Sequence, residues 1–154
     1  MFNREYTYKQ VVATLHGCRV DLSDEKFFLE LTLRAIRNAG MRLAKTKSRN
    51  PLSYQIEDDI MGGGVSVNAL ITTSHLTVHT ANRHGAVEFD CATCGRDSEP
   101  WLALETFKRA LRPLYTRVRY ECGSRAEHTP SSREVYPTIK SSEPIVKSRR
   151  TVSF

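Results

Sequence analysis

The sequence predicts an α+β two-layer sandwich, in which a mainly antiparallel sheet carries two helices packed on one face. Several segments alternate apolar and polar residues with the period of two that half-buried strands show. Two longer segments repeat their apolar residues with helical spacing instead. Because these elements follow one another as strand, helix, several strands, helix and strand, an antiparallel sheet under a layer of helices fits the order.

The first part of the chain is expected to form a strand and a helix. The apolar run over residues 9–16 predicts the first strand, and Gly17-Cys18 turns the chain. Ser23 or Asp24 is suited to cap the helix that follows, which ends at residues 38–40. The apolar face of this helix consists of Phe27, Phe28, Leu31, Leu33, Ala35 and Ile36.

The middle of the chain supplies most of the predicted sheet. Apolar and basic residues alternate over residues 41–47 and predict a second strand. We expect a mobile loop over residues 50–64, which contain a proline and three successive glycines. A polar turn is expected at residues 81–85. Three further strands are predicted over residues 65–72, 74–80 and 86–93.

The last predicted elements are a helix and a strand. Pro100 opens a helix over residues 101–111, and residues 117–121 form the final strand. The buried stripe of that helix is Trp101, Leu104, Phe107 and Leu111. We therefore expect a single domain over residues 1–121. Residues 122–154, rich in Ser, Pro, Arg and Lys, are expected to form a basic, disordered tail.

Composition narrows the classes of function. The net charge is +6 over 154 residues, but about half of the excess falls in the tail, so nucleic-acid binding is not favoured. No apolar run approaches the ~18 residues of a membrane span, and the N-terminal residues lack the apolar stretch of a signal peptide. The four cysteines are expected to stay reduced. We expect a soluble cytoplasmic protein.

The chemically informative residues fall in neighbouring predicted strands. Ser74-His75-Leu76-Thr77-Val78-His79-Thr80 is followed by Thr93-Cys94-Gly95 and then by Pro100-Trp101. Together these residues resemble the bacterial-type S-adenosylmethionine decarboxylases. Upstream, Gly64-Val65-Ser66 resembles the segment that precedes the processing site of that family. The resemblance extends over residues 8–121 and is densest over residues 64–112.

The resemblance implies a proenzyme that cuts itself between Thr73 and Ser74. The Ser74 hydroxyl would attack the Thr73 carbonyl, and elimination and hydrolysis would leave a pyruvoyl group derived from Ser74. This cofactor forms a Schiff base with the substrate amine and accepts electrons during decarboxylation. By the same resemblance His79 transfers protons during processing, Ser66 assists it, and Cys94 protonates the decarboxylated carbon. A homodimer with active sites near the subunit interface is also implied.

The same residues have alternative interpretations. Cys91-x-x-Cys94 and three nearby histidines form a candidate zinc set. The three histidines are His75, His79 and His84. Structural zinc sites usually use two such cysteine pairs, and strand alternation places Cys91 and Cys94 on opposite faces, so no metal is expected. Without the resemblance, the serines and histidines named above are ordinary polar residues of strands.

Three departures from the family bear on processing and substrate. Thr73 stands where the family typically has glutamate. Ala81-Asn82-Arg83 replaces a Trp-Pro-Glu segment, so the aromatic ring for adenine and the carboxylate for ribose are missing, whereas Arg83 suits a substrate carboxylate. The loop over residues 51–63 carries Glu57 and two aspartates, which either hold a cationic side chain or are simply solvated.

These observations lead to three functional hypotheses. The first is a pyruvoyl-dependent enzyme that converts S-adenosylmethionine to decarboxylated S-adenosylmethionine and CO2 for polyamine (spermidine) biosynthesis. The second is a related ornithine or arginine decarboxylase, with Arg83 and Glu57 as candidate substrate-binding residues. The third, motivated by Thr73, is an unprocessed pseudoenzyme that regulates a partner. A small-molecule substrate and a second copy of the chain are the expected partners, and no membrane is expected among them.

Overall fold

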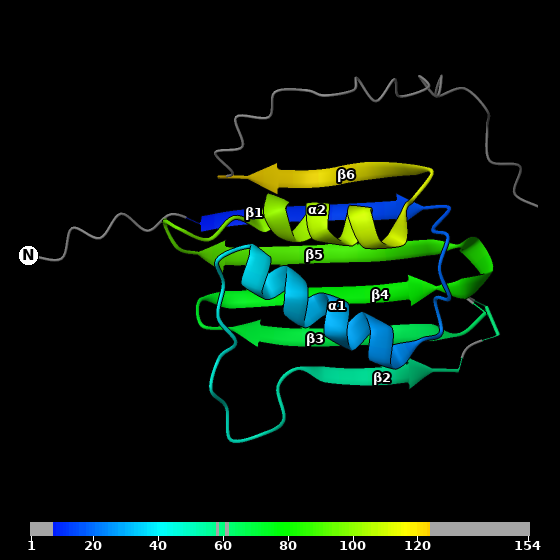
Figure 1. Ribbon diagram of the computed structural model, residues 1–154, viewed down its shortest axis with the longest axis horizontal. Coiled ribbons are helices and arrows are strands. Elements are labelled where there is room, and N and C mark those ends of the chain that lie inside the picture. The colour runs from blue at the N-terminus through cyan, green and yellow to red at the C-terminus, as the bar shows by residue number, and fades with distance from the viewer. Residues whose placement is uncertain (1–7, 58, 61, 124–154) are drawn as a thin grey trace, which may run out of the picture.

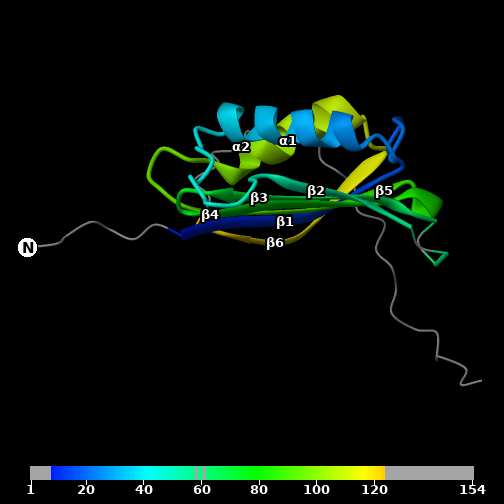
Figure 2. The ribbon, with the colours of Figure 1, turned by 90° about the horizontal axis from the view of Figure 1, so that it is seen from below.

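The sheet and helices are arranged as two layers. The computed structural model describes residues 8–57, 59–60 and 62–123. Over this part of the chain, a six-stranded antiparallel sheet lies beneath two helices (Figure 1). Figure 2 shows both helices on one face, while the described residues place no helix on the opposite face, which we call the outer face. The predicted α+β two-layer sandwich is confirmed.

The first strand of the chain lies inside the sheet rather than at its edge. The strands are β1 (Tyr8–His16), β2 (Leu52–Ile56), β3 (Gly64–Ile71), β4 (Ser74–Ala81), β5 (Ala86–Cys94) and β6 (Tyr115–Cys122). The helices are α1 (Glu25–Asn38) and α2 (Pro100–Leu111), with a 3-10 turn at Asn82–His84. The order across the sheet is β2-β3-β4-β5-β1-β6, so β1 pairs with β5 and β6.

The core lies between the sheet and the helices. Alternation along each strand sends every second side chain toward α1 and α2. Phe89 of β5 contacts Phe107 of α2 edge to face, with ring centroids 5.4 Å apart. Asp24 caps α1 by accepting a hydrogen bond from the Phe27 amide at 2.9 Å. Gly40 follows α1 with a φ of +70°, the left-handed conformation that glycine adopts without steric cost.

The strand predicted at residues 41–47 is not formed. Leu43 makes only an isolated bridge to Ile71, and the Ala44 amide donates to the Leu70 carbonyl at 2.9 Å. The physical reason is competition for one edge. β2 pairs with β3 from Gly64 to Asn68, so the preceding segment is left with only the far end of β3.

The prediction of a loop over residues 50–64 is wrong for residues 52–56, which form β2. β2 is an edge strand that pairs only with β3, and its Leu52 and Tyr54 are exposed. Residues 52–56 do alternate apolar and polar side chains, but the preceding proline and the glycines at 62–64 favoured a loop. Backbone pairing with β3 holds this strand at the edge of the sheet.

The other predicted elements are confirmed within a residue or two at their ends. The last strand extends from Tyr115 to Cys122, and the predicted disordered tail lies almost wholly outside the described residues. Within those residues, no helix has the length and apolar character that a membrane crossing requires.

Candidate active site

Ser74 lies at the start of a strand, beside the end of the strand that carries Cys94. It is the first residue of β4 and follows the Thr72–Thr73 turn from β3. The β4–β5 register pairs His75 with Ala92. Continuing that register by one residue places Ser74 beside Thr93 and next to Cys94, the last residue of β5. The structure therefore places the predicted cleavage serine and the predicted proton donor at neighbouring backbone positions of paired strands.

Ser66 and His79 form a second pair elsewhere on the sheet. They are directly opposite in the β3–β4 register, and His79 is also opposite Glu88 of β5. Their side chains are partly buried and point to the outer face. His79 is five residues along β4 from Ser74, which at the rise of an extended strand is about 16 Å. A single chain does not bring this pair to Ser74 and Cys94.

The two cysteines of the Cys91-x-x-Cys94 segment lie on opposite faces, as predicted. Cys91 is fully buried against the helices, and Cys94 is partly exposed on the outer face. Burial, with smaller contributions from Asp90 and Glu99, raises the pKa of the Cys91 thiol well above its usual range. The two thiols cannot ligate one ion in this arrangement. Over the described residues, no group of three or more histidine, cysteine or acidic side chains is placed to hold a metal.

Thr73 is tied to the core by a chain of hydroxyl groups. Its Oγ1 lies 3.1 Å from Oγ1 of Thr93, which lies 2.8 Å from Oγ of Ser98. The Ser98 hydroxyl in turn donates to the Gly95 carbonyl at 3.2 Å. These bonds connect the residue before the predicted cut to the loop that follows Cys94. Sequence analysis did not anticipate this network.

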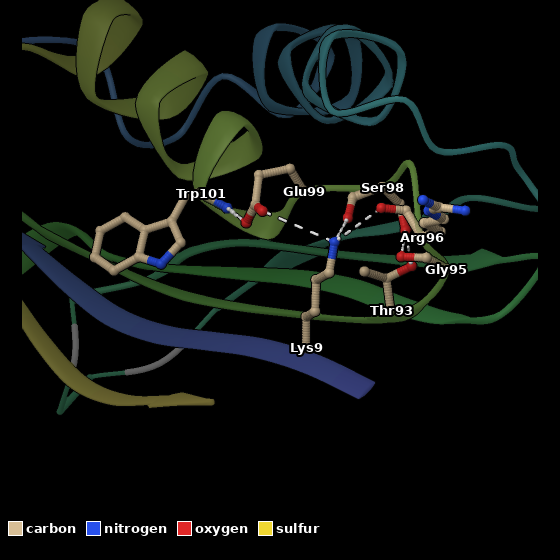
Figure 3. Close-up of polar contacts among 7 residues, drawn as sticks. All are labelled: Lys9, Thr93, Gly95, Arg96, Ser98, Glu99 and Trp101. Atoms are coloured by element: carbon tan, nitrogen blue, oxygen red, sulfur yellow. Dashed lines mark hydrogen bonds and ion pairs between the residues drawn. The ribbon is translucent and has the colours of Figure 1, made fainter. Parts of the chain in front are cut away.

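A buried lysine anchors the same loop. Lys9 is only 4% exposed, and its Nζ donates to the carbonyls of Ser98 at 2.7 Å and Arg96 at 3.2 Å (Figure 3). The Glu99 carboxylate lies 3.9 Å away. Such charge-assisted bonds are stronger than neutral ones, so the loop after Cys94 is held firmly. Lys9 is two residues before Val11 in β1, so strand alternation puts both side chains on the core face. This alternation could have identified Lys9 as a buried lysine from the sequence.

The Ser74 hydroxyl contacts the adjacent histidine. Ser74 Oγ lies 3.2 Å from His75 Nδ1, and His75 Nε2 lies 3.6 Å from the Asp90 carboxylate. Gln10 donates to the same carboxylate oxygen at 2.8 Å. Sequence analysis placed His75 in the segment that carries the resemblance and in the candidate zinc set, and it assigned no catalytic role to His75 or Asp90. Adjacency to Ser74 was the available signal for His75, whereas Asp90 needed the strand register.

Tyr8 completes the surroundings of Cys94. The two residues are opposite each other in the β1–β5 register. Loss of contact with water raises the pKa of the Tyr8 phenol, and Cys122, Asp90 and Cys94 raise it further. These groups are therefore within electrostatic reach of one another at this end of the outer face.

Two cavities lie at opposite ends of β4. A cavity of about 200 Å³ opens beside Thr73 and Thr93 and is also lined by Arg42 and Arg96. A more open one of about 470 Å³ is lined by several residues of the β2–β3 connection and the turn after β4. This second cavity includes both predicted substrate-binding residues, Arg83 and Glu57, together with Asp59. Its residues flank the end of β4 that carries His79.

Comparisons with known proteins identify the family to which the chain belongs. Residues 9–121 match the family model described as S-adenosylmethionine decarboxylase. The chain is 34% identical over 113 residues to an arginine decarboxylase proenzyme of Hyperthermus butylicus, covering 73% of this chain and 75% of the relative. It is 30% identical over 111 residues to an S-adenosylmethionine decarboxylase proenzyme of Thermotoga petrophila, covering 71% and 78%.

A solved structure shares the fold. The crystal structure of the adenosylmethionine decarboxylase from Aquifex aeolicus superposes with a TM-score of 0.64 at 22% sequence identity. The match covers 83% of this chain and 98% of that one.

Proposed function

Since the chain belongs to the S-adenosylmethionine decarboxylase family, and is thereby a pyruvoyl-dependent decarboxylase, we propose that it becomes active by cutting itself between Thr73 and Ser74. The proenzymes of this family form their pyruvoyl group by self-cleavage. The observation that carries the proposal is the position of Ser74. It begins a strand directly after a turn, with its hydroxyl bonded to an imidazole and Cys94 beside it.

The cleavage requires no reactant other than water. Ser74 Oγ bonds to the Thr73 carbonyl carbon, the peptide C–N bond breaks, and an ester with a free Ser74 amine results. Loss of the Ser74 Cα proton then breaks the Cβ–Oγ bond, releasing the Thr73 carboxylate and leaving a dehydroalanine. Water hydrolyses this residue to the pyruvoyl group and ammonia. His79 with Ser66 is proposed to assist the proton transfers, as the family resemblance implies.

Cys94 is the proposed proton donor of the mature enzyme. The pyruvoyl group, when present, supplies an electron sink for the negative charge that loss of CO2 leaves on the substrate. The supporting observations are that Cys94 lies one residue beyond the register partner of Ser74 and that its side chain is partly exposed. A thiol carries a proton that it can donate to a carbanion as a general acid.

We place the mature enzyme in a homodimer in which two outer faces meet. The supporting observation is that Ser74 with Cys94 and Ser66 with His79 lie at different points along the strands. If a twofold axis related two facing sheets, Ser74 and Cys94 of each chain would lie against the serine–histidine pair of the other chain. The cavity containing Arg83 and Glu57 would then lie close to the partner's reacting centre.

S-adenosylmethionine is the first substrate candidate, and the product would be decarboxylated S-adenosylmethionine for polyamine, in particular spermidine, synthesis. The family description and the Thermotoga petrophila relative support it.

Arginine, or the related ornithine, is the second candidate, and two observations favour it. The Hyperthermus butylicus relative is an arginine decarboxylase proenzyme. In the larger cavity, Glu57 and Asp59 suit a cationic side chain and Arg83 suits a carboxylate. Among the described residues that line it, none is aromatic and suited to adenine.

The decisive experiment measures the intact mass of denatured protein and then CO2 release. Two fragments that divide at Thr73–Ser74, the second lighter by one ammonia than a free-serine peptide, are expected from the wild type. Ser74→Ala is expected to remain whole and inactive. The mature protein, offered S-adenosylmethionine, arginine and ornithine separately, should release CO2 from one of them. A single full-length mass after long incubation would overturn the proposal and favour the regulatory pseudoenzyme.

A further inference from the structure

We propose that His75 is the base that takes the proton from the Ser74 hydroxyl when the chain cuts itself, and that Asp90 orients its imidazole. This inference rests on the proposed self-cleavage and deepens it by naming a catalytic residue within the same chain. It assigns to His75 and Asp90 a role that the family resemblance does not carry to either residue.

The arrangement has the three parts that activate a serine. The nucleophile, Ser74 Oγ, is 3.2 Å from His75 Nδ1, within hydrogen-bond distance. The other ring nitrogen, Nε2, is 3.6 Å from the Asp90 carboxylate, longer than a hydrogen bond but close enough for the carboxylate to attract an N–H at Nε2. A nucleophile bonded to a base, which is in turn oriented by a third group, is the general pattern of serine activation.

Asp90 is itself held in place. Gln10 donates to its Oδ1 at 2.8 Å, and the Tyr8 hydroxyl donates to the Gln10 side-chain carbonyl at 2.7 Å. These residues come from β1 and β5, which pair along their whole length. A carboxylate beside Nε2 favours the tautomer that carries its proton there. That tautomer leaves the Nδ1 lone pair directed at the Ser74 hydroxyl.

The position of His79 contrasts with that of His75. The side chain of His79 lies beside Ser66 and Glu88, about 16 Å along β4 from Ser74. It reaches the Ser74 hydroxyl only if a second copy presents it. His75 touches that hydroxyl within one chain, so the first proton transfer does not depend on the partner.

The proton balance of the step is simple. The Ser74 proton passes to His75 Nδ1 while Oγ bonds to the Thr73 carbonyl carbon. When the C–N bond breaks, the imidazolium returns the same proton to the departing nitrogen, which becomes the Ser74 α-amine. His75 ends as it began, and the later elimination is not assigned to it.

The test follows the fraction of uncut full-length chain over time by intact mass. His75→Ala is expected to slow cleavage by about 100-fold or more, the usual contribution of a positioned base. Added imidazole is expected to restore part of the rate, which a merely structural role would not allow. His84→Ala serves as the matched histidine control and should cleave at the wild-type rate. Asp90→Asn keeps the shape of the side chain and should slow cleavage by a smaller factor.

The outcomes separate this inference from the proposed function. If the wild type cleaves and His75→Ala cleaves equally fast, the inference is overturned and self-cleavage stands. Slow cleavage of a normally folded His75→Ala that imidazole does not restore also overturns it. If His75→Ala fails to fold, Asp90→Asn decides, because an unchanged rate there removes the orienting role. A wild type that never cleaves defeats the proposed function, and the inference with it.

Discussion

The two faces of the sheet, built from the same strands, have different roles. Toward the helices, β4 and β5 present fully buried apolar side chains such as Leu76 and Phe89. The alternate residues of the same strands, which include His75, Asp90 and Cys94, point to the outer face. Packing and chemistry therefore alternate along each strand, and the core face holds rigid the backbone that positions the reactive groups. The consequence of a substitution should depend on its face more than on its residue type.

The largest expected effect tests this with one residue type on two faces. Cys94→Ala should leave most of the self-cleavage intact and lower turnover by about 100-fold or more, because the proposed proton donor is lost. Cys91→Ala removes a buried thiol from the core and should lower stability while retaining turnover. CO2 release by the cleaved protein, with thermal unfolding, measures both. Full activity in Cys94→Ala would remove its assigned role.

The next prediction compares two adjacent residues of β5 that point to opposite faces of the sheet. Phe89→Ala should lower the free energy of unfolding by about 3–5 kcal/mol, because it empties the space against Phe107. Glu88 points outward, where it is bonded to Thr14 and paired with Arg119, and Glu88→Ala should cost about 1 kcal/mol or less. Urea unfolding of both variants provides the measurement. Equal losses would show that the two faces contribute alike to stability.

Lys9 is an exception to the rule, since it is a charged group on the core face. Lys9→Met keeps the stem but leaves the Ser98 and Arg96 carbonyls without their donor, and should cost about 1–3 kcal/mol. Turnover should fall as well, because the loop after Cys94 loses its anchor. Urea unfolding and CO2 release test the two effects separately. A variant as stable as the wild type would contradict the anchoring role.

The smallest expected effect concerns Thr73. Thr73→Val removes the bond to Thr93 and should slow self-cleavage about fivefold, the equivalent of about 1 kcal/mol. Thr73→Ser keeps a hydroxyl and should cleave at nearly the wild-type rate. Thr72→Val, which loses only a bond to the Arg42 carbonyl, is the neighbouring control. The rate of cleavage of each variant is measured by intact mass over time. Equal rates for Thr73→Val and Thr73→Ser would show that the hydroxyl network does not contribute to cleavage.

Much of the fold could be predicted because periodicity reports burial directly. The opposite orientation of Cys91 and Cys94 followed from strand alternation and is confirmed. The β2 edge strand was missed because Pro51 and the three glycines at 62–64 favoured a loop, although residues 52–56 alternate apolar and polar side chains. The segment 41–47 was predicted as a strand on its own pattern, without knowledge that β2 occupies most of the neighbouring edge.

The sequence by itself determined the two layers, the inward and outward sides of each strand, and the resemblance that singles out Ser74 and Cys94. Only the tertiary structure decided which of these groups meet. Local periodicity carries no information on how strands far apart in the chain align. The pairing of β1 with β5 therefore had to be seen before Lys9 could be placed beside Thr93, or Gln10 beside Asp90. The separation of His79 from Ser74 and the approach of His75 to Asp90 have the same physical origin, the register of hydrogen-bonded strands.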